Sequence, residues 1–212
     1  MQRRALRPEY VTSRWYQENV LRFNYDYRAL GFNRRASQER RFAALATLGA
    51  FDGKRLLDAG CGFGDFYAWL AARGVRPQYT GLDVTPPMIE RCQQRFAGTG
   101  AAFVTSDVLA YEAEQDFDYV VASGLFGYGA QGTRARIQPT LERLFAMTRI
   151  GLAVNFLSRC APARSAKRIY LHAWDVLEFV LTLTPAVRLD HSYLPNDFTI
   201  FLYRTPAWQE AR

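Results

Sequence analysis

The sequence is poor in the residues that bind metals or form disulfides. Its 212 residues include 3 Cys and 2 His, and no two cysteines form a C-x-x-C pair. Structural zinc sites and disulfide frameworks are built from such pairs and clusters, so we expect no metal site and no disulfide framework. A chain of this length can bury a complete hydrophobic core without either cross-link.

Long apolar segments are missing as well. No run of about 18 apolar residues occurs, as a transmembrane helix would require. The arginines near the N-terminus are not followed by the apolar stretch of a secretory signal. We therefore expect a cytoplasmic protein with no membrane partner, and the hydrophobic fraction of 49% is ordinary for a globular domain.

Positive charge is concentrated near the N-terminus. The net charge is +7; residues 1–55 hold 12 Lys and Arg against 5 Asp and Glu, whereas the remaining residues hold 15 of each. A basic segment of this kind indicates either a solvated face or a surface that receives an anionic partner.

Strands and helices alternate in the hydrophobic pattern after residue 54. Two closing strands then follow each other directly. This order predicts an α/β fold with a doubly wound, seven-stranded, mostly parallel sheet and an antiparallel C-terminal hairpin. The predicted strands are 55–60, 78–82, 102–105, 117–123, 151–157, 186–193 and 198–204, and the predicted helices are 65–73, 86–96, 134–148 and 173–183.

The first 50 residues are predicted to form a helical extension. Residues 9–30 are rich in aromatic side chains and indicate a helix to at least Phe23. A second helix is predicted to start at Ser37, its N-cap, and to end at Gly49. We divide the chain into a helical lid or extension, 1–50, and a ligand-binding domain, 51–212.

The segment with the clearest chemical meaning is Leu56–Gly64, LLDAGCGFG, in which an apolar strand runs into three alternating glycines. Glycine allows a tight turn, a close approach of the backbone to a ligand and close packing of the next helix. Backbone N–H groups there are expected to face a polar ligand. The expected ligand-binding positions are Asp58, Ala59, Gly60, Cys61 and Gly62.

Acidic residues end the next two predicted strands. Asp83 lies 25 positions after Asp58, and Asp107 ends the following strand. A carboxylate at the end of the second strand is placed to accept hydrogen bonds from ribose hydroxyls. The next carboxylate is placed to accept one from an adenine amino group. Val84, Met88 and Val108 are expected to cover the faces of the adenine ring.

The three segments LLDAGCGFG, GLDVTPPMIERC and VTSDVL resemble the first three motifs of class I S-adenosylmethionine-dependent methyltransferases. The order of elements over 54–204 resembles that fold as well. More loosely, the chain is similar to small bacterial single-domain methyltransferases with an aromatic N-terminal helix and an N-F-L-S segment, here Asn155–Ser158.

This resemblance implies S-adenosyl-L-methionine as the cofactor and assigns parts of it to residues. It implies that residues 58–62 line the methionine part, Asp83 holds the ribose and Asp107 reads the adenine edge. It also implies that Ser123 and Gly124 border the methyl group.

A few side chains are candidates for the chemistry and for ligand charge. His191 and Tyr16 are the candidate catalytic residues, each as a general base. Arg41 is a candidate partner of the methionine carboxylate, and Asn155 is a candidate for the acceptor site. The signature Asp/Asn-Pro-Pro-Tyr/Phe of many amino-methylating enzymes is missing, because the matching stretch reads SGLF.

Taken together, these patterns predict a methyltransferase acting on a small-molecule acceptor of aromatic or anionic character. Two alternatives stay open. The basic, aromatic N-terminal quarter is compatible with an RNA acceptor, and a fold alone does not exclude a non-catalytic protein that binds S-adenosylmethionine or a partner. Nothing in the sequence indicates the oligomeric state.

Overall fold

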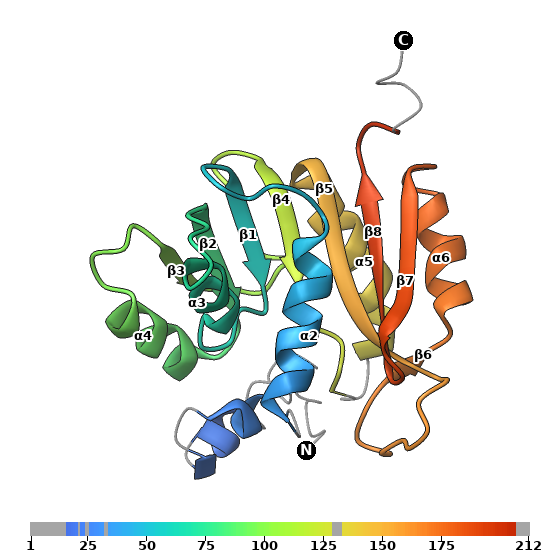
Figure 1. The fold of residues 1–212 in the computed structure, drawn as a ribbon, viewed down its shortest axis with the longest axis horizontal. Helices are drawn as coiled ribbons and strands as arrows, with labels where there is room; N and C mark the ends of the chain where they lie inside the picture. Colours follow the sequence, from blue (N-terminus) through green and yellow to red (C-terminus); the bar gives the residue numbers. More distant parts are fainter. Residues whose placement is uncertain (1–15, 21, 24–25, 32–33, 129–132, 207–212) are drawn as a thin grey trace, which may run out of the picture.

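A computed structural model of the chain describes residues 16–20, 22–23, 26–31, 34–128 and 133–206. Of the predicted N-terminal helix, residues 16–20 and 22–23 are helical, and residues 9–15 lie outside the described part. A short 3-10 helix, η1 (Tyr27–Leu30), follows. The continuous fold begins at α2 (Figure 1).

An eight-stranded sheet forms the centre of the molecule, in the order β3-β2-β1-β4-β5-β8-β7, with β6 paired to β5. Neighbouring strands from β3 to β5 are parallel, and β8 is antiparallel to β5 and β7. The doubly wound sheet and the C-terminal hairpin are confirmed, and the unpredicted strand is the two-residue β6. The strands are β1 (Arg55–Ala59), β2 (Gln78–Asp83), β3 (Ala102–Thr105), β4 (Phe117–Ala122), β5 (Thr148–Ser158), β6 (Tyr170–Leu171), β7 (Val187–Leu194) and β8 (Asp197–Tyr203).

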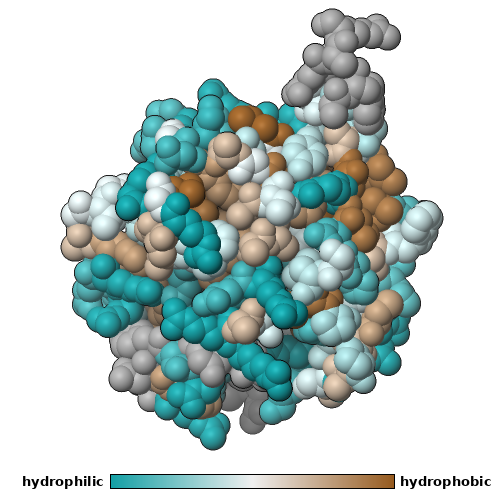
Figure 2. Space-filling view, viewed as in Figure 1, coloured by the Kyte–Doolittle hydropathy of each residue, from teal (hydrophilic) through white to brown (hydrophobic). Residues whose placement is uncertain are grey.

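Helices cover both faces of the sheet (Figure 1). Among the described residues, no helix is long and apolar enough to cross a bilayer. Figure 2 shows a mostly hydrophilic surface on the α2 side, with a hydrophobic area over β7 and α6. The helices are α2 (Arg35–Ala46), α3 (Asp65–Ala71), α4 (Pro86–Arg95), α5 (Thr133–Ala146) and α6 (Ala173–Leu181).

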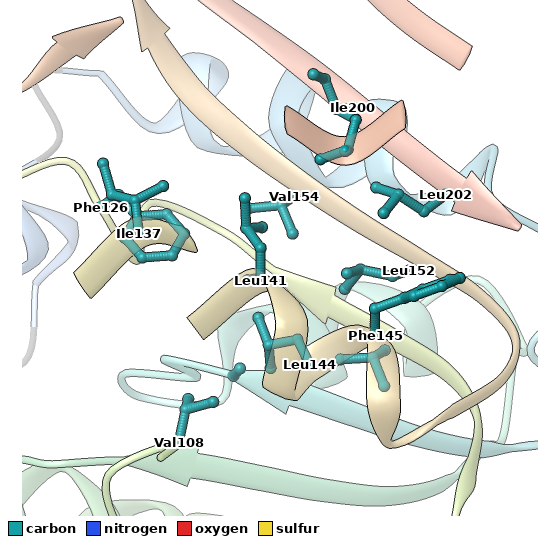
Figure 3. Close-up of a cluster of buried hydrophobic side chains, with 14 of the residues drawn as sticks. Val108, Phe126, Ile137, Leu141, Leu144, Phe145, Leu152, Val154, Ile200 and Leu202 are labelled. Carbon is teal, nitrogen blue, oxygen red and sulfur yellow. The ribbon is translucent and has the colours of Figure 1, made fainter. Parts of the chain in front are cut away.

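Successive side chains of a strand point to opposite faces of the sheet, so the strands contribute to an apolar layer on each face. Leu152 packs with the helices α5 and α6, whereas its neighbour Ala153 packs with α2, α3 and α4. Figure 3 shows the first layer, where Leu141 and Leu144 of α5 meet Leu152 and Val154 of β5. Burying a Leu or Val side chain contributes roughly 1.5–3 kcal/mol, so these layers hold the strand ends in place.

The predicted N-cap of α2, Ser37, was wrong by three residues. Arg34 is the N-cap residue, in an extended conformation and without a side-chain cap bond. The backbone N–H of Ser37 already donates to Arg34 O at 3.1 Å, which places Ser37 inside the first turn. The helix ends at Ala46, where the Thr47 hydroxyl donates to Ala44 O, before Gly49 is reached.

The described part of the predicted extension lies in two environments. Val20, Ala29 and Leu30 pack with Phe63 and Met88, above the glycine turn. In contrast, α2 contributes apolar side chains to the core beside the sheet. The helix α2 packs in the same layer as α3 and α4. The division of the chain at residue 50 stays a prediction.

Candidate active site

A cavity of about 890 Å³ opens at the carboxyl ends of the parallel strands. This is the edge at which open α/β sheets bind ligands. Of the predicted site residues, Ala59 and His191 are not in its lining. The cavity brings together Tyr16, Arg41, Asp58, Gly60, Cys61, Gly62, Asp83, Val84, Met88, Asp107, Val108, Ser123 and Gly124.

The turn after β1 requires its glycines. Gly60, Gly62 and Gly64 have φ of 79°, 54° and 70°, which L side chains rarely adopt. A Cβ on Gly64 would lie 2.6 Å from the ring of Phe96, which follows α4, so a side chain there would collide with this ring. Ala59, by contrast, is fully buried within β1.

The backbone N–H groups of this turn donate to the protein itself, whereas the sequence analysis expected them to face a ligand. Gly60 and Cys61 both donate to Leu82 O at 2.8 Å, and the N–H of Gly62 donates to the Asp83 carboxylate at 3.0 Å. The tight turn folds these donors back onto β2. The expectation that they face a ligand was therefore wrong for these three positions.

Asp58 lies behind the turn and is almost fully buried. Burial raises the pKa of its carboxyl to about 7, while a hydrogen bond from the Tyr79 hydroxyl, 2.5 Å from Oδ2, lowers it. The nearby charge of Asp83 raises it further. Near neutral pH, Asp58 is thus divided between its protonated and ionised forms.

Asp83 is fixed at the end of β2 by backbone donors. Its Oδ2 accepts from Gly62 N at 3.0 Å, and its Oδ1 accepts from Thr85 N at 2.9 Å. Burial raises the pKa of the carboxyl, and the hydrogen bonds with Thr85 and Gly62 lower it. The carboxylate also lines the cavity, where a ribose diol would need an acceptor.

Tyr16 lines the same part of the cavity, with its ring 6.5 Å from that of Tyr128. Burial raises the pKa of its hydroxyl to about 12; Arg168 lowers that pKa and Asp83 raises it. A phenol in this environment stays protonated at neutral pH. A protonated phenol offers a hydrogen-bond donor to the cavity, and the catalytic role of Tyr16 stays a prediction.

Asp107 has a partner that the sequence analysis missed. Arg136 of α5 donates through Nη2 to both carboxylate oxygens, at 2.7 and 2.5 Å, and Leu109 N donates to Oδ1 at 2.9 Å. Both Asp107 and Arg136 line the cavity. Because Arg136 lies 29 positions away on an amphipathic helix, no local pattern distinguished it from a solvated arginine.

Asn155 fixes the segment predicted to border the methyl group. Its Oδ1 accepts from Gly124 N at 2.8 Å, and its Nδ2 donates to Ser123 Oγ at 3.4 Å. Asn155 is buried and lines the cavity, as its candidate place in the acceptor site requires. One amide from β5 therefore sets the position of the end of β4.

Arg41 forms a buried ion pair with Asp197 of β8. Nε donates to Oδ1 at 2.7 Å and Nη2 donates to Oδ2 at 2.6 Å. Burial raises the pKa of Asp197, and Arg41 lowers it. The expected contact of Arg41 with a methionine carboxylate stays a prediction.

His191 lies on β7, outside the cavity lining. Its ring packs 6.2 Å from that of Phe198, and its Nε2 has no hydrogen-bond partner among the described residues. A general base must come within hydrogen-bond reach of the proton it removes. Although Leu194 of the same strand lines the cavity, His191 does not, and its role as this base stays a prediction.

Comparisons with known proteins agree with this geometry. A family described as a methyltransferase domain matches residues 56–149. The Mycobacterium tuberculosis protein Rv1506c, named as a methyltransferase without a stated substrate, is 32% identical over 165 residues, which is 74% of this chain and 98% of that protein. A fatty-acid O-methyltransferase of Mycolicibacterium smegmatis is 33% identical over 108 residues, 46% of this chain and 39% of that protein.

Solved structures show the same fold. The magnesium protoporphyrin IX methyltransferase of Synechocystis PCC 6803 has a TM-score of 0.68 at 17% identity, covering 96% of this chain and 100% of that chain. The 1,6-didemethyltoxoflavin-N1-methyltransferase of Burkholderia thailandensis has a TM-score of 0.65 at 20% identity, covering 97% and 93%. The relatedness to Rv1506c, the matched domain and the glycine turn followed by Asp83 establish that the chain belongs to the class I S-adenosylmethionine-dependent methyltransferase family.

Proposed function

We propose that this chain transfers a methyl group from S-adenosylmethionine to a small-molecule acceptor. The observation that carries this proposal is the single cavity in which the motif residues at the ends of β1, β2 and β4 meet a second group of apolar and polar side chains. A cavity of about 890 Å³ has room for two ligands of moderate size.

The motif half of the cavity fits the chemistry of the cofactor. Asp83 is placed to hold the ribose hydroxyls, with Tyr16 beside it as a donor. Val84, Met88 and Val108 are placed to cover the adenine, and Asp107 would share its oxygens between the adenine amino group and Arg136. When bound, S-adenosylmethionine supplies a strongly electrophilic methyl group, so the protein's main task is alignment.

The other half of the cavity fits an acceptor with an apolar or aromatic body. Phe126 and Phe156 stack with ring centroids 5.5 Å apart, and Phe156 stacks on Phe198 in turn. Leu125 and Leu157 also line this part. These side chains exclude water and hold the acceptor, while Asn155 keeps Ser123 and Gly124 in place.

The groups available to remove a proton limit which nucleophiles the acceptor can present. No histidine is among the described residues that line the cavity. The carboxylates in the lining already have partners: Asp65, Asp107 and Asp197 are each paired with an arginine, and Asp58 and Asp83 accept hydrogen bonds. We propose that the acceptor presents a nucleophile that is unprotonated or acidic at working pH, because such a group needs no general base.

The known neighbours favour a small molecule over RNA. The two structural neighbours are named for magnesium protoporphyrin IX and 1,6-didemethyltoxoflavin, and the M. smegmatis relative is named for fatty acids. These acceptors belong to those proteins. Their shared small size supports the same class of acceptor here.

The proposal is tested with methyl-labelled S-adenosylmethionine and a deproteinised metabolite extract. The expected result is a labelled small molecule, heavier than its precursor by about 14 mass units for one CH₂ plus the mass added by the isotope. The Asp83→Ala variant should give much less of it. Label found only in added RNA would favour the RNA alternative, and cofactor binding without any labelled product would favour the non-catalytic one.

A further inference from the structure

A second, smaller hollow adjoins the acceptor end of the cavity. Its volume is about 420 Å³, and its lining includes four arginines: Arg134, Arg159, Arg164 and Arg168. Ser165, Arg168 and Tyr170 line both spaces. An acceptor in the large cavity can therefore extend into this second hollow, which we call the arginine pocket.

The segments around the arginine pocket are basic throughout. Residues 123–141 and 155–174 contain six Lys and Arg and no Asp or Glu. The charge balance of residues 56–212 as a whole conceals this local excess, because the acids lie elsewhere. Lys167, which also lines the large cavity, belongs to the same basic segment.

Hydrogen bonds fix the frame of the pocket. Arg134 Nη2 donates to Tyr170 O at 3.3 Å, and Ser165 N donates to the Tyr170 hydroxyl at 3.0 Å. Arg168 N donates to Ser165 O at 3.1 Å, while its Nη2 donates to Gly31 O at 2.7 Å. The loop between β5 and β6 is thereby tied both to α5 and to the N-terminal segment.

Within the described residues, no carboxylate pairs with Arg134, Arg159 or Arg164. Like charges gathered in one hollow repel each other, and a bound anion relieves this repulsion. A guanidinium group offers a planar fork of donors that matches an oxyanion such as phosphate in two hydrogen bonds. The pocket therefore has the charge and the donors of an oxyanion site.

We propose that the arginine pocket binds an anionic group of the acceptor, of the phosphate class, while the acceptor's reacting end lies in the large cavity. This inference rests on the proposed function, since it assigns a property to the acceptor. It also explains why a pocket rich in arginine adjoins an apolar cavity. The same chemistry recognises a phosphate ester and free inorganic phosphate, which the experiments below separate.

The first experiment measures binding of pyrophosphate and of inorganic phosphate to the full chain by calorimetry at fixed ionic strength, with S-adenosylhomocysteine present. We expect the double variant Arg159→Ala/Arg164→Ala to weaken pyrophosphate binding about tenfold or more, as for the loss of charge-assisted hydrogen bonds. Arg159→Lys/Arg164→Lys should retain most of the affinity. Inorganic phosphate should compete with pyrophosphate and bind more weakly.

The matched control is Lys54→Ala/Arg149→Ala, which removes the same charge from exposed positions at the opposite end of the sheet. Its pyrophosphate affinity should equal that of the parent chain. Equal affinities in the Arg159→Ala/Arg164→Ala variant and in this control would overturn the arginine pocket as an oxyanion site. Affinity for S-adenosylhomocysteine, measured in the same samples, reports on the proposed function separately.

The second experiment examines the labelled product of the metabolite screen. A product retained on an anion exchanger, and formed with a raised KM and a nearly unchanged kcat by the Arg159→Ala/Arg164→Ala variant, supports the inference. A neutral product, or label in RNA, overturns it. A neutral small-molecule product would leave the methyltransferase proposal standing, so the two proposals fail on different results.

Discussion

Asp83 accepts hydrogen bonds from two backbone N–H groups, and its place at the end of β2 follows from the strand itself. We expect Asp83→Ala to weaken binding of S-adenosylhomocysteine by about 1.5–3 kcal/mol, the range for hydrogen bonds to a charged group. Calorimetry measures the change, and circular dichroism checks that the variant folds. Glu112→Ala, which removes an exposed carboxylate, is the control, and an affinity of Asp83→Ala equal to that control would refute the ribose assignment.

Asp58 is expected to make the stability of the fold depend on pH, with stability falling as the pH rises. Because burial raises its pKa from 3.8 to about 7 in the folded state, its contribution to stability is complete below about pH 4 and is lost as the pH rises through 7. Asp58→Asn cannot ionise. The variant should therefore gain stability relative to the parent between pH 5 and pH 8, by up to about 4 kcal/mol.

Urea unfolding at several pH values measures this difference. The Tyr79 hydroxyl can still donate to the amide oxygen of the asparagine, so the variant keeps a partner for that buried group. A stability difference that does not change between pH 5 and pH 8 would show that Asp58 has an ordinary pKa in the folded chain.

At the scale of the elements, the ion pair of Arg41 and Asp197 joins α2 to β8 across 156 positions of sequence. Removing one partner leaves the other charge buried and unpaired, so Asp197→Ala should destabilise the fold by about 3–5 kcal/mol. The double variant Arg41→Met/Asp197→Leu should recover most of this loss. Chemical unfolding of both variants tests the pair; similar stability of the parent and Asp197→Ala would contradict it.

Some boundaries of the strands and helices could be predicted from the sequence, and others could not. The strand ends at Ala59, Asp83 and Thr105 were foreseeable because glycines and acids follow apolar runs there. At these ends, Gly60, Asp83 and Asp107 line the site. The start of α2 was misplaced because its N-cap, Arg34, carries no capping signal. β6 was missed because a two-residue strand has no periodicity to detect.

Long-range partners were beyond the reach of local patterns. Arg136 beside Asp107, and Asp197 beside Arg41, become neighbours only when the sheet and its helices assemble. His191 was chosen for its residue type near a strand end, and the structure places it on β7 outside the cavity lining. Position along a strand was a better guide to the site than residue chemistry alone.

On the scale of the whole molecule, the site joins segments from most of the chain. The N-terminal segment reaches the glycine turn through Leu30, and Arg168 in the loop after β5 donates to Gly31 O. The ends of β1, β2, β4 and β5 complete the lining. A ligand that binds here interacts with the native arrangement alone, and it must stabilise the fold as one unit.

We therefore expect S-adenosylhomocysteine at 100 times its Kd to raise the free energy of unfolding by about 2.7 kcal/mol, with the rise set by mass action. Urea unfolding with and without the ligand measures this shift. Asp83→Ala should show a much smaller shift at the same ligand concentration, because it binds more weakly. The Arg159→Ala/Arg164→Ala variant should show the full shift, since its changes lie at the acceptor end. If the parent chain unfolds at the same urea concentration with and without millimolar ligand, the cavity does not bind this nucleoside.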